Sequence, residues 1–354
     1  MELTALTADA PIAFGTDGVR GRVPGGFNLQ MLTRLGKGVC TWLLEEGADG
    51  VLRLPGLPES MAKPFARRLL VGYDRRPDSA EFAAHLAKVC RAYGFVADLT
   101  PACAPTPALA FATRGEGYDC SLIVTASHNP YSDNGLKLKP HYGGSATGEI
   151  TARVEAATAD AARPVACTTV KETGPTSFDP FPAYAARLRE LVPFRPGALP
   201  GVTIQFDPMH GATTGWFPRI VEPLGLTVNQ LHADPPTRLT SLHPEPLAVW
   251  LSTLIEAVRS TPGSVGVACD GDGDRLGLVD EQGRFLSSQL FYPLILLSRL
   301  KLGDLPVPAI AKTFSGTLLL NRIAARYGLQ LEEVPVGYKH ISLMLAQGQV
   351  SMGG

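Results

Sequence analysis

Short apolar stretches alternate with longer amphipathic ones along most of this chain. β-Branched and other apolar residues gather in the stretches predicted to be buried strands, which are residues 69–73, 95–99, 120–124, 202–207, 265–269, 276–279 and 309–312. Helices are predicted over residues 80–93, after Pro107, over 150–162 and 216–224, from residue 288 onward and over 317–327. This alternation predicts a layered α/β architecture. Residues 163–180 contain several prolines and show no period, which predicts a linker.

The length and charge of the chain fit a multi-domain enzyme better than a nucleic-acid-binding protein. At 354 residues the chain is expected to form two or three domains with sizeable cores. Its 32 basic and 33 acidic residues give a net charge of −1, so no basic footprint for nucleic acid is expected. Any phosphate ligand would have to be held by a local group of arginines and lysines.

The cysteines and the apolar runs favour a cytoplasmic protein without a membrane partner. Six cysteines are scattered along the chain with no CxxC pair, as expected in a reducing compartment. Met1 is not followed by a charged and then an apolar stretch, so no secretory signal is expected. The longest apolar run, around residues 290–297, contains Pro293 and is too short to cross a membrane. Nothing in the sequence indicates the oligomeric state.

A polar hexapeptide, TASHNP at residues 125–130, follows the predicted strand at 120–124. Asn129 and Pro130 favour an extended or turn backbone, so no helix begins there. Ser127 is therefore predicted to lie on a loop at the carboxyl end of a strand, where α/β folds usually carry their chemistry. Taken alone, the hexapeptide favours an Asx turn in which Ser127 and Asn129 only bond the local backbone.

A second loop, DGDGDR at residues 270–275, strengthens the case for chemistry. Three carboxylates separated by glycines can surround one hard cation and leave positions open for phosphate or water oxygens, as Mg²⁺ prefers. An EF-hand calcium loop is the rival, with Glu281 at its twelfth position. However, Arg275 stands where that loop requires glycine, and the flanks are predicted to be strands. A hairpin turn would explain one Asp-Gly pair but not three aspartates and an arginine. The loop therefore predicts a magnesium site.

Six strings distributed over nearly the whole chain belong together. They are FGTDGVRG at residues 14–21, GYDRR at 72–76, TASHNP at 125–130 continuing to NGLK at 134–137, DPMHG at 207–211, DGDGDR at 270–275 and VGYKH at 336–340. In content and order they resemble the α-D-phosphohexomutases, the phosphoglucomutase and phosphomannomutase family. The resemblance implies tandem three-layer α/β domains with mixed sheets, which in that family build a heart-shaped enzyme of four domains around a deep cleft.

On this resemblance the chain divides into three parts. Residues 1–165 would form a first domain with the serine loop, residues 166–287 a second domain with the metal loop, and residues 288–354 part of a third domain. The family continues to a glycine-rich loop that grips sugar hydroxyls and to a fourth domain, whereas this sequence stops at QVSMGG, residues 349–354. A truncated chain with little turnover is therefore expected. An inactive fragment that binds metal or a partner is the alternative from another class.

The resemblance also implies roles for single residues. Ser127 would carry a phosphoryl group that passes to a hexose phosphate through a hexose 1,6-bisphosphate, which also serves as activator. One Mg²⁺ ion per chain would be bound by Ser127, Asp270, Asp272 and Asp274. The other matches are cations near the transferring group (Arg20, Lys137 and Arg275), general acid/base candidates (His128 and Lys137) and substrate-binding residues (Lys339 and His340). The alternative role for His128, expected just as much as acid/base chemistry, is only to orient the backbone of the serine loop. His210 is expected to support a turn.

The resemblance ranks the substrates less sharply than it identifies the reaction. Asn129-Pro130 after Ser-His, and the run at residues 137–147, resemble bacterial phosphoglucomutase-type members. Interconversion of glucose 1-phosphate and glucose 6-phosphate is therefore expected first, the mannose phosphates second and the glucosamine phosphates third.

Overall fold

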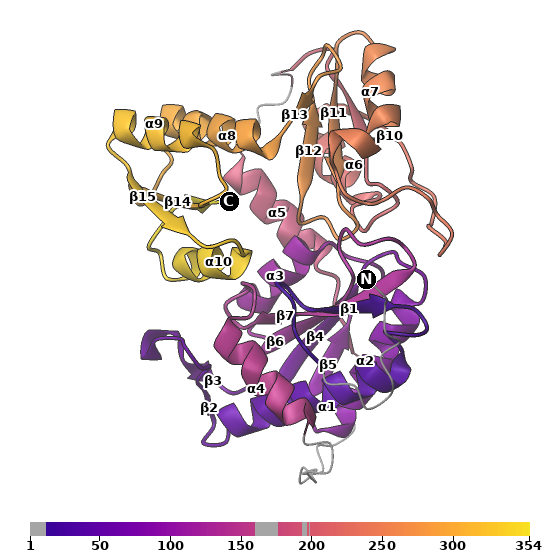
Figure 1. Cartoon of the computed structure of the whole chain (residues 1–354), viewed down its shortest axis with the longest axis vertical. Coiled ribbons are helices and arrows are strands. Elements are labelled where there is room, and N and C mark those ends of the chain that lie inside the picture. The colour runs from indigo at the N-terminus through magenta and orange to yellow at the C-terminus, as the bar shows by residue number, and fades with distance from the viewer. Residues whose placement is uncertain (1–11, 160–175, 193–196, 198) are drawn as a thin grey trace.

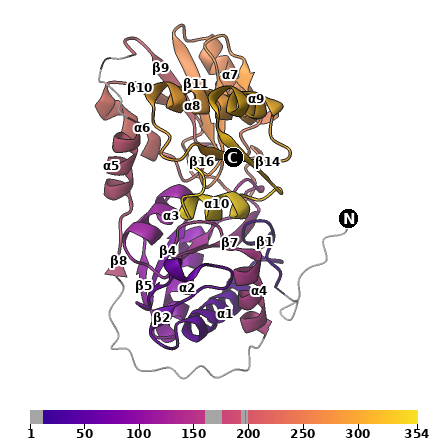
Figure 2. The same ribbon diagram turned by 90° about the vertical axis from the view of Figure 1, so that its left-hand side faces the viewer.

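The computed structural model describes residues 12–159, 176–192, 197 and 199–354. In the described part of the chain three larger sheets follow one another in sequence, each packed against helices (Figure 1). The expected architecture of tandem α/β domains with mixed sheets is thus confirmed. Figure 2 shows the first sheet and its helices at one end of the molecule, with the other two sheets at the opposite end.

The first sheet has six strands in the order β1-β7-β6-β4-β5-β8. Strands β6, β4, β5 and β8 are parallel to one another, while β7 runs antiparallel to both β6 and β1. The bounds are β1 Val19–Arg22, β4 Arg68–Tyr73, β5 Val96–Leu99, β6 Cys120–Val124, β7 Asp133–Pro140 and β8 Thr176–Ser177. A small hairpin of β2 (Val51–Leu52) and β3 (Lys63–Pro64), with a 3₁₀ turn at Glu59–Met61, lies outside this sheet.

Helices cover both faces of the first sheet. The side chains of each strand alternate between these two faces. On β4, Leu69 and Val71 join a core formed with α1 (Leu29–Glu46), α2 (Ser79–Ala92) and α4 (Gly148–Ala159). Leu70 points the other way, into a second core with α3 (Thr106–Gly115). Helix α5 (Phe181–Leu191) packs against α3 at the edge of this second core. The result is a three-layer α/β unit.

The second sheet has the order β10-β9-β11-β12-β13, parallel among the first three strands and antiparallel after β11. Its strands are β9 Thr203–Asp207, β10 Thr227–Gln230, β11 Ser264–Cys269, β12 Leu276–Val279 and β13 Phe285–Leu286. Helix α7 (Ser252–Arg259) packs on β9, β11 and β12, and α6 (Trp216–Val221) continues into a 3₁₀ turn at Glu222–Leu224. A third 3₁₀ turn lies at Ala248–Trp250. Trp216 of α6 packs into the second core of the first unit, which joins the two units.

The third sheet has three parallel strands in the order β15-β14-β16. The strands are β14 Ala309–Thr313, β15 Gln330–Val334 and β16 Met352–Gly353. Helices α8 (Ser288–Leu302) and α9 (Leu318–Tyr327) enclose a core on one face, and α10 (Tyr338–Ala346) covers the other. The Ser342 hydroxyl of α10 accepts a 3.3 Å hydrogen bond from the backbone N–H of Ser145, so the third unit contacts the first.

Most elements predicted from the hydrophobic pattern are present, and β6 and β12 have the predicted bounds. The linker predicted over residues 163–180 is wrong in part. Thr176–Ser177 form β8 and pair with Asp98 and Leu99, so the first sheet continues beyond residue 165, the boundary expected from the sequence. Two residues are too few to show a period of two. Residues 160–175 of the expected linker and the end of the helix expected over 150–162 lie outside the described residues.

Five of the six cysteines lie in the described part of the chain. Cys40, Cys90, Cys103, Cys120 and Cys269 are free thiols, and Cys167 lies outside the described residues. None of the described helices is both long and apolar enough to span a membrane.

Candidate active site

Ser127 lies on the turn that follows β6, as its sequence context predicts. It is almost fully buried, and its φ of 53° is in the left-handed region that residues with a Cβ rarely adopt. Its Oγ donates a 2.9 Å hydrogen bond to Asp270 Oδ2, across a sequence separation of 143 residues. The serine loop begins at residue 125, after the carboxyl end of β6, and the acidic loop (residues 270–275) follows the carboxyl end of β11. The two loops therefore meet at one site. The hexapeptide is thus more than a local Asx turn.

Arg76 holds the serine loop in this conformation. The Nε of its buried guanidinium pairs with Asp74 at 3.0 Å. The remaining donors bond four backbone carbonyls of the loop, those of Ser127, Asn129, Pro130 and Asp133, at 2.6–3.1 Å. All five guanidinium N–H groups are thereby used. The sequence gives no sign of this role, because the bonded groups are 51–57 residues away in the chain.

Asp74 connects Arg76 to the other side of the same loop. Besides the guanidinium, its carboxylate accepts hydrogen bonds from the hydroxyls of Thr125 and Ser79, at 2.6 and 2.8 Å. Thr125 Oγ1 in turn accepts a 2.8 Å hydrogen bond from the backbone N–H of Ser127. Burial raises the pKa of Asp74, although Arg76 and these donors oppose the shift. This buried network fixes the backbone of Ser127 from both directions.

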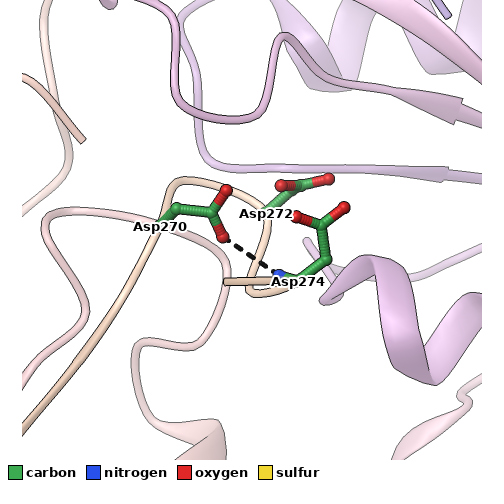
Figure 3. A group of neighbouring side chains, drawn as sticks. All are labelled: Asp270, Asp272 and Asp274. Carbon is green, nitrogen blue, oxygen red and sulfur yellow. Dashed lines mark hydrogen bonds between the residues drawn. The ribbon is translucent and has the colours of Figure 1, made fainter. Parts of the chain in front are cut away.

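The acidic loop connects β11 to β12, so strands flank it, whereas helices flank an EF-hand loop. Oxygens of Asp270, Asp272 and Asp274 lie within 4.8 Å of one another (Figure 3). Asp270 Oδ1 accepts 3.0 Å hydrogen bonds from the backbone N–H groups of Asp274 and Arg275, which curl the loop around its first carboxylate. We call these three residues the acidic group.

The acidic loop docks directly onto the first unit. Thr106, the first residue of α3, donates its hydroxyl to Asp272 Oδ2 at 2.6 Å and its N–H to the Asp272 carbonyl at 2.8 Å. A Cβ on Gly271 would lie 2.5 Å from the carbonyl oxygen of Ser127. Only glycine allows the acidic loop to approach the serine loop so closely. Gly271 is therefore needed for the contact between the two loops, in addition to the curvature of the acidic loop.

The negative charges of the acidic group are not fully balanced by the cation beside them. Burial, together with the charges of Asp272 and Asp274, raises the pKa of Asp270 well above its ordinary value. Burial also acts to raise the pKa of Asp272, but the ammonium of Lys137 outweighs it and holds that pKa well below its usual range. One lysine thus neutralises the group only in part.

The residues present fit a hard cation. Asp272 Oδ1 is buried and has no hydrogen-bond partner in the described structure. Burying an unpartnered carboxylate oxygen is costly, so such an atom calls for a ligand. With the neighbouring carboxylates and the Ser127 hydroxyl, the donor set consists of oxygens alone, as Mg²⁺ and Ca²⁺ require.

Lys137 enters the site from β7, the strand antiparallel to β6. Its side chain is fully buried, with Nζ 2.7 Å from Asp272 Oδ2, 2.5 Å from Asp274 Oδ2 and 3.1 Å from Asp17 Oδ2. Burial alone would lower the pKa of Lys137, but these carboxylates raise it well above its ordinary value. The residue is a stable cation at the centre of the site, where the sequence predicts one.

Arg20 and His128 lie beside Ser127, as predicted. The Arg20 guanidinium donates to Asn129 Oδ1 at 2.9 Å and lies 3.5 Å from His128 Nδ1. The same Nδ1 is 3.4 Å from Ser127 Oγ. Burial, followed by the charges of Arg275 and Arg20, lowers the pKa of His128 to about 4. The imidazole is therefore neutral near pH 7.

The other predicted residues are Arg275, Lys339 and His340. Arg275 influences His128 through its charge, but its guanidinium pairs with Glu245 at 3.2 Å. Lys339, on the first turn of α10, shares a cavity with residues 14–18 of the loop before β1. His340 is exposed, and no hydrogen bond or ion pair in the described part of the chain joins it to Ser127 or the acidic group. The structure thus brings together Ser127, His128, Lys137, Arg20 and the acidic group.

Two histidines lie outside this cluster. His210 has a φ of 60°, and its Nδ1 lies 3.0 Å from the Asp234 carbonyl, which agrees with the expected turn role. His232 packs against it, and its Nδ1 lies 2.9 Å from the buried Asp207 Oδ2. That hydrogen bond raises the pKa of His232, partly opposed by burial.

We expect the stabilisation contributed by His232 to depend on pH. Because its folded-state pKa is raised, the stabilisation is complete below the unfolded value of about 6.5 and is lost as the pH rises through the folded value. His232→Gln should therefore lower the Tm more at about pH 5.5 than at about pH 9. Thermal unfolding of wild type and variant at both pH values measures this, and an equal loss at both would contradict the assignment.

Comparison with known proteins agrees with the fold and the site. Three models of the phosphoglucomutase/phosphomannomutase family match, α/β/α domain I at residues 57–164, domain II at 182–283 and domain III at 292–354. These matches cover most of the chain. The protein belongs to the phosphoglucomutase/phosphomannomutase family. It is therefore a hexose phosphate mutase, an isomerase of the α-D-phosphohexomutase type.

Similar proteins span more residues than this chain. Phosphoglucosamine mutase of Chlamydia trachomatis serovar A is 30% identical, with 99% of this chain matched to 72% of the relative. Phosphoglucosamine mutase of a Parafrankia species is 29% identical over 96% of this chain and 73% of the relative. A Thermus thermophilus crystal structure assigned as a phosphomannomutase has a TM-score of 0.82 and 29% identity, over 98% of this chain and 74% of that one. A Burkholderia thailandensis family member (TM-score 0.78, 21% identity, covering 99% and 71%) shows the shared fold alone.

Proposed function

We propose that Ser127 is the residue that carries the phosphoryl group, and that the acidic group binds one Mg²⁺ ion beside it. The observation that carries this proposal is the 2.9 Å hydrogen bond from Ser127 Oγ to Asp270, next to an unpartnered Asp272 oxygen. A phosphate on Ser127 would bring two negative charges into a buried site. The nearby cations Lys137 and Arg20 lower the cost of those charges.

The proposed reaction moves a phosphoryl group twice. A hydroxyl oxygen of the hexose phosphate attacks phosphorus and loses its proton. The bond from phosphorus to Ser127 Oγ breaks, Ser127 Oγ takes up a proton, and a hexose 1,6-bisphosphate forms. After the sugar reorients, Ser127 Oγ attacks the other phosphate, and the isomeric hexose phosphate leaves. When bound, Mg²⁺ would neutralise charge on the phosphoryl oxygens. This route also explains why a hexose bisphosphate would act as activator, because it loads Ser127 directly.

The side chains around Ser127 have the protonation states that this reaction needs. His128 is neutral, and its Nδ1 lies 3.4 Å from Ser127 Oγ, so it can accept the Ser127 proton when that oxygen attacks the bisphosphate. Lys137 is protonated and can stabilise the developing charge. We therefore assign His128 as the proton acceptor and Lys137 as its cationic counterpart. Arg20 and Arg275 would stabilise the phosphoryl oxygens, and Lys339 and His340 would contact the substrate from α10.

Phosphorylation at Ser127 is the direct test. After incubation with glucose 1,6-bisphosphate and Mg²⁺, wild type should gain the mass of one phosphoryl group, and peptide mapping should place it on Ser127. Ser127→Ala should abolish this label, whereas Ser132→Ala, a matched serine on the same loop, should retain it. Labelling that persists in Ser127→Ala would remove Ser127 from this role. Metal binding without any labelling would support the binding-fragment alternative instead.

The same phosphoprotein can identify the sugar. The named relatives at 29–30% identity are phosphoglucosamine mutases, which favours an amino sugar phosphate, whereas the strings around Ser127 resemble phosphoglucomutase-type members. Labelled protein should transfer its phosphoryl group fastest to the preferred hexose phosphate. The measurement is loss of label on mixing with the 6-phosphates of glucosamine, glucose and mannose. Equal rates for all three would indicate that the described site does not discriminate at the sugar.

A further inference from the structure

Lys137 occupies an unusual position, because one ammonium contacts carboxylates of two different loops. Asp272 and Asp274 belong to the acidic loop of the second unit, whereas Asp17 lies on the loop before β1 in the first unit. The side chain is about 2% exposed, so water cannot replace any of these partners. A buried ammonium must keep a carboxylate partner wherever it moves.

The surroundings of Asp17 suit it to hold such a cation. Residues 137 and 139 of β7 lie on the same face of the strand, while Leu136 and Leu138 face the hydrophobic core. The Asp17 carboxylate therefore lies between two lysines, at 3.1 Å from Lys137 Nζ and 3.4 Å from Lys139 Nζ. Burial acts to raise the pKa of Asp17, but these two cations outweigh it and leave that pKa below its usual value.

A divalent cation at the acidic group would compete with Lys137. Both would use oxygens of Asp272 and Asp274, and two cations sharing those oxygens would repel each other strongly in a buried site. The ammonium could not then stay on Asp272 and Asp274. The ammonium must instead shift toward a carboxylate outside the acidic group. In the described structure Asp17 is the carboxylate that Lys137 already contacts there.

We propose that Asp17 is a positioning residue that holds the Lys137 ammonium when a divalent cation binds the acidic group. Without Asp17, Lys137 would remain on Asp272 and Asp274 and oppose the cation. With it, the same lysine stays buried and charged beside Ser127, where the proposed reaction uses it. The inference rests on the proposed function, because it assumes that the acidic group binds Mg²⁺.

A double-mutant cycle tests the proposal by calorimetric titration with Mg²⁺. Asp17→Asn should weaken Mg²⁺ binding about five-fold or more, a coupling of ordinary size for interacting sites. In a Lys137→Met background the same Asp17→Asn change should alter the affinity by less than about two-fold, because no competing ammonium remains. Equal effects in the two backgrounds, or no effect of Asp17→Asn in wild type, would overturn the proposal.

A control variant and the wild-type titration distinguish failure of the Asp17 proposal from failure of the metal assignment. Glu245→Gln removes the same charge from a residue that pairs with Arg275 and not with Lys137, so it should weaken Mg²⁺ binding less than Asp17→Asn does. This comparison remains valid even if Lys137→Met does not fold. An equal loss of Mg²⁺ affinity in the two variants would show that Asp17 acts only through its long-range charge, and it would overturn the proposal. Absence of Mg²⁺ binding by wild type would refute the metal assignment itself, independently of Asp17.

Discussion

Arg76→Ala is expected to destabilise the protein by about 3–5 kcal/mol, the cost of breaking a buried ion pair by removing one partner. Asp74 is completely buried and would lose its counter-charge. Four backbone carbonyls of the serine loop would lose their donor at the same time. Because Ser127 has a left-handed backbone that the surrounding contacts must maintain, the loop should relax and phosphorylation of Ser127 should be lost.

Two other arginine variants make this prediction specific. Arg76→Lys keeps a charge beside Asp74, but an ammonium cannot reproduce the planar five-donor geometry, so stability should recover more than labelling does. Arg91→Ala removes an arginine that donates to one carbonyl, that of Ala97, outside the site, and it should leave labelling intact. Chemical denaturation measures the stability, and intact mass measures the label. Wild-type labelling by Arg76→Ala would show that the loop is held without the guanidinium.

The hydrophobic pattern predicts those parts of the site that depend on a single strand and the loop that follows it. The strand at residues 120–124 has five consecutive buried residues, and the strand at 264–269, in which buried and half-buried residues alternate, precedes the acidic loop. Each loop could therefore be placed at the carboxyl end of a strand from local pattern alone. That both loops lie at a single site follows from packing, which the hydrophobic pattern does not encode. The family resemblance supplied that step.

Strand β7 shows what the hydrophobic pattern alone could not predict, namely that Lys137 and Lys139 are buried. Its residues 136–139 alternate leucine with lysine, a pattern typical of a strand with one face in solvent. In the structure both lysines are buried, because carboxylates from distant loops neutralise them. A buried charge depends on partners far away in the sequence. The alternation of leucine and lysine alone therefore predicts that these lysines lie on the surface. Arg76 escaped prediction for the same reason, since a turn-like Arg-Pro-Asp string gives no sign of five buried hydrogen bonds.

Asp272→Asn is expected to weaken Mg²⁺ binding at least ten-fold, which corresponds to about 1.4 kcal/mol. Asp272 is the member of the acidic group with a buried oxygen that has no hydrogen-bond partner, so it has the most to gain from a cation. An amide nearly preserves the shape of the side chain and can keep the hydrogen bond from Thr106, so the loss should report charge and coordination rather than a collapsed loop. Calorimetric titration with Mg²⁺, supported by thermal unfolding to confirm folding, gives the comparison.

Glu281→Gln is the matched control for this experiment. Glu281 stands at the twelfth position of the rival calcium loop, where an EF-hand places its bidentate ligand. In the structure it belongs to the turn between β12 and β13, and it is not part of the acidic group. Its substitution should therefore leave Mg²⁺ affinity unchanged. Equal affinities in wild type and Asp272→Asn would refute the metal assignment. A marked preference for Ca²⁺, lost in Glu281→Gln, would restore the calcium interpretation despite the flanking strands, because then the ligand set and not the flanking structure would decide the ion.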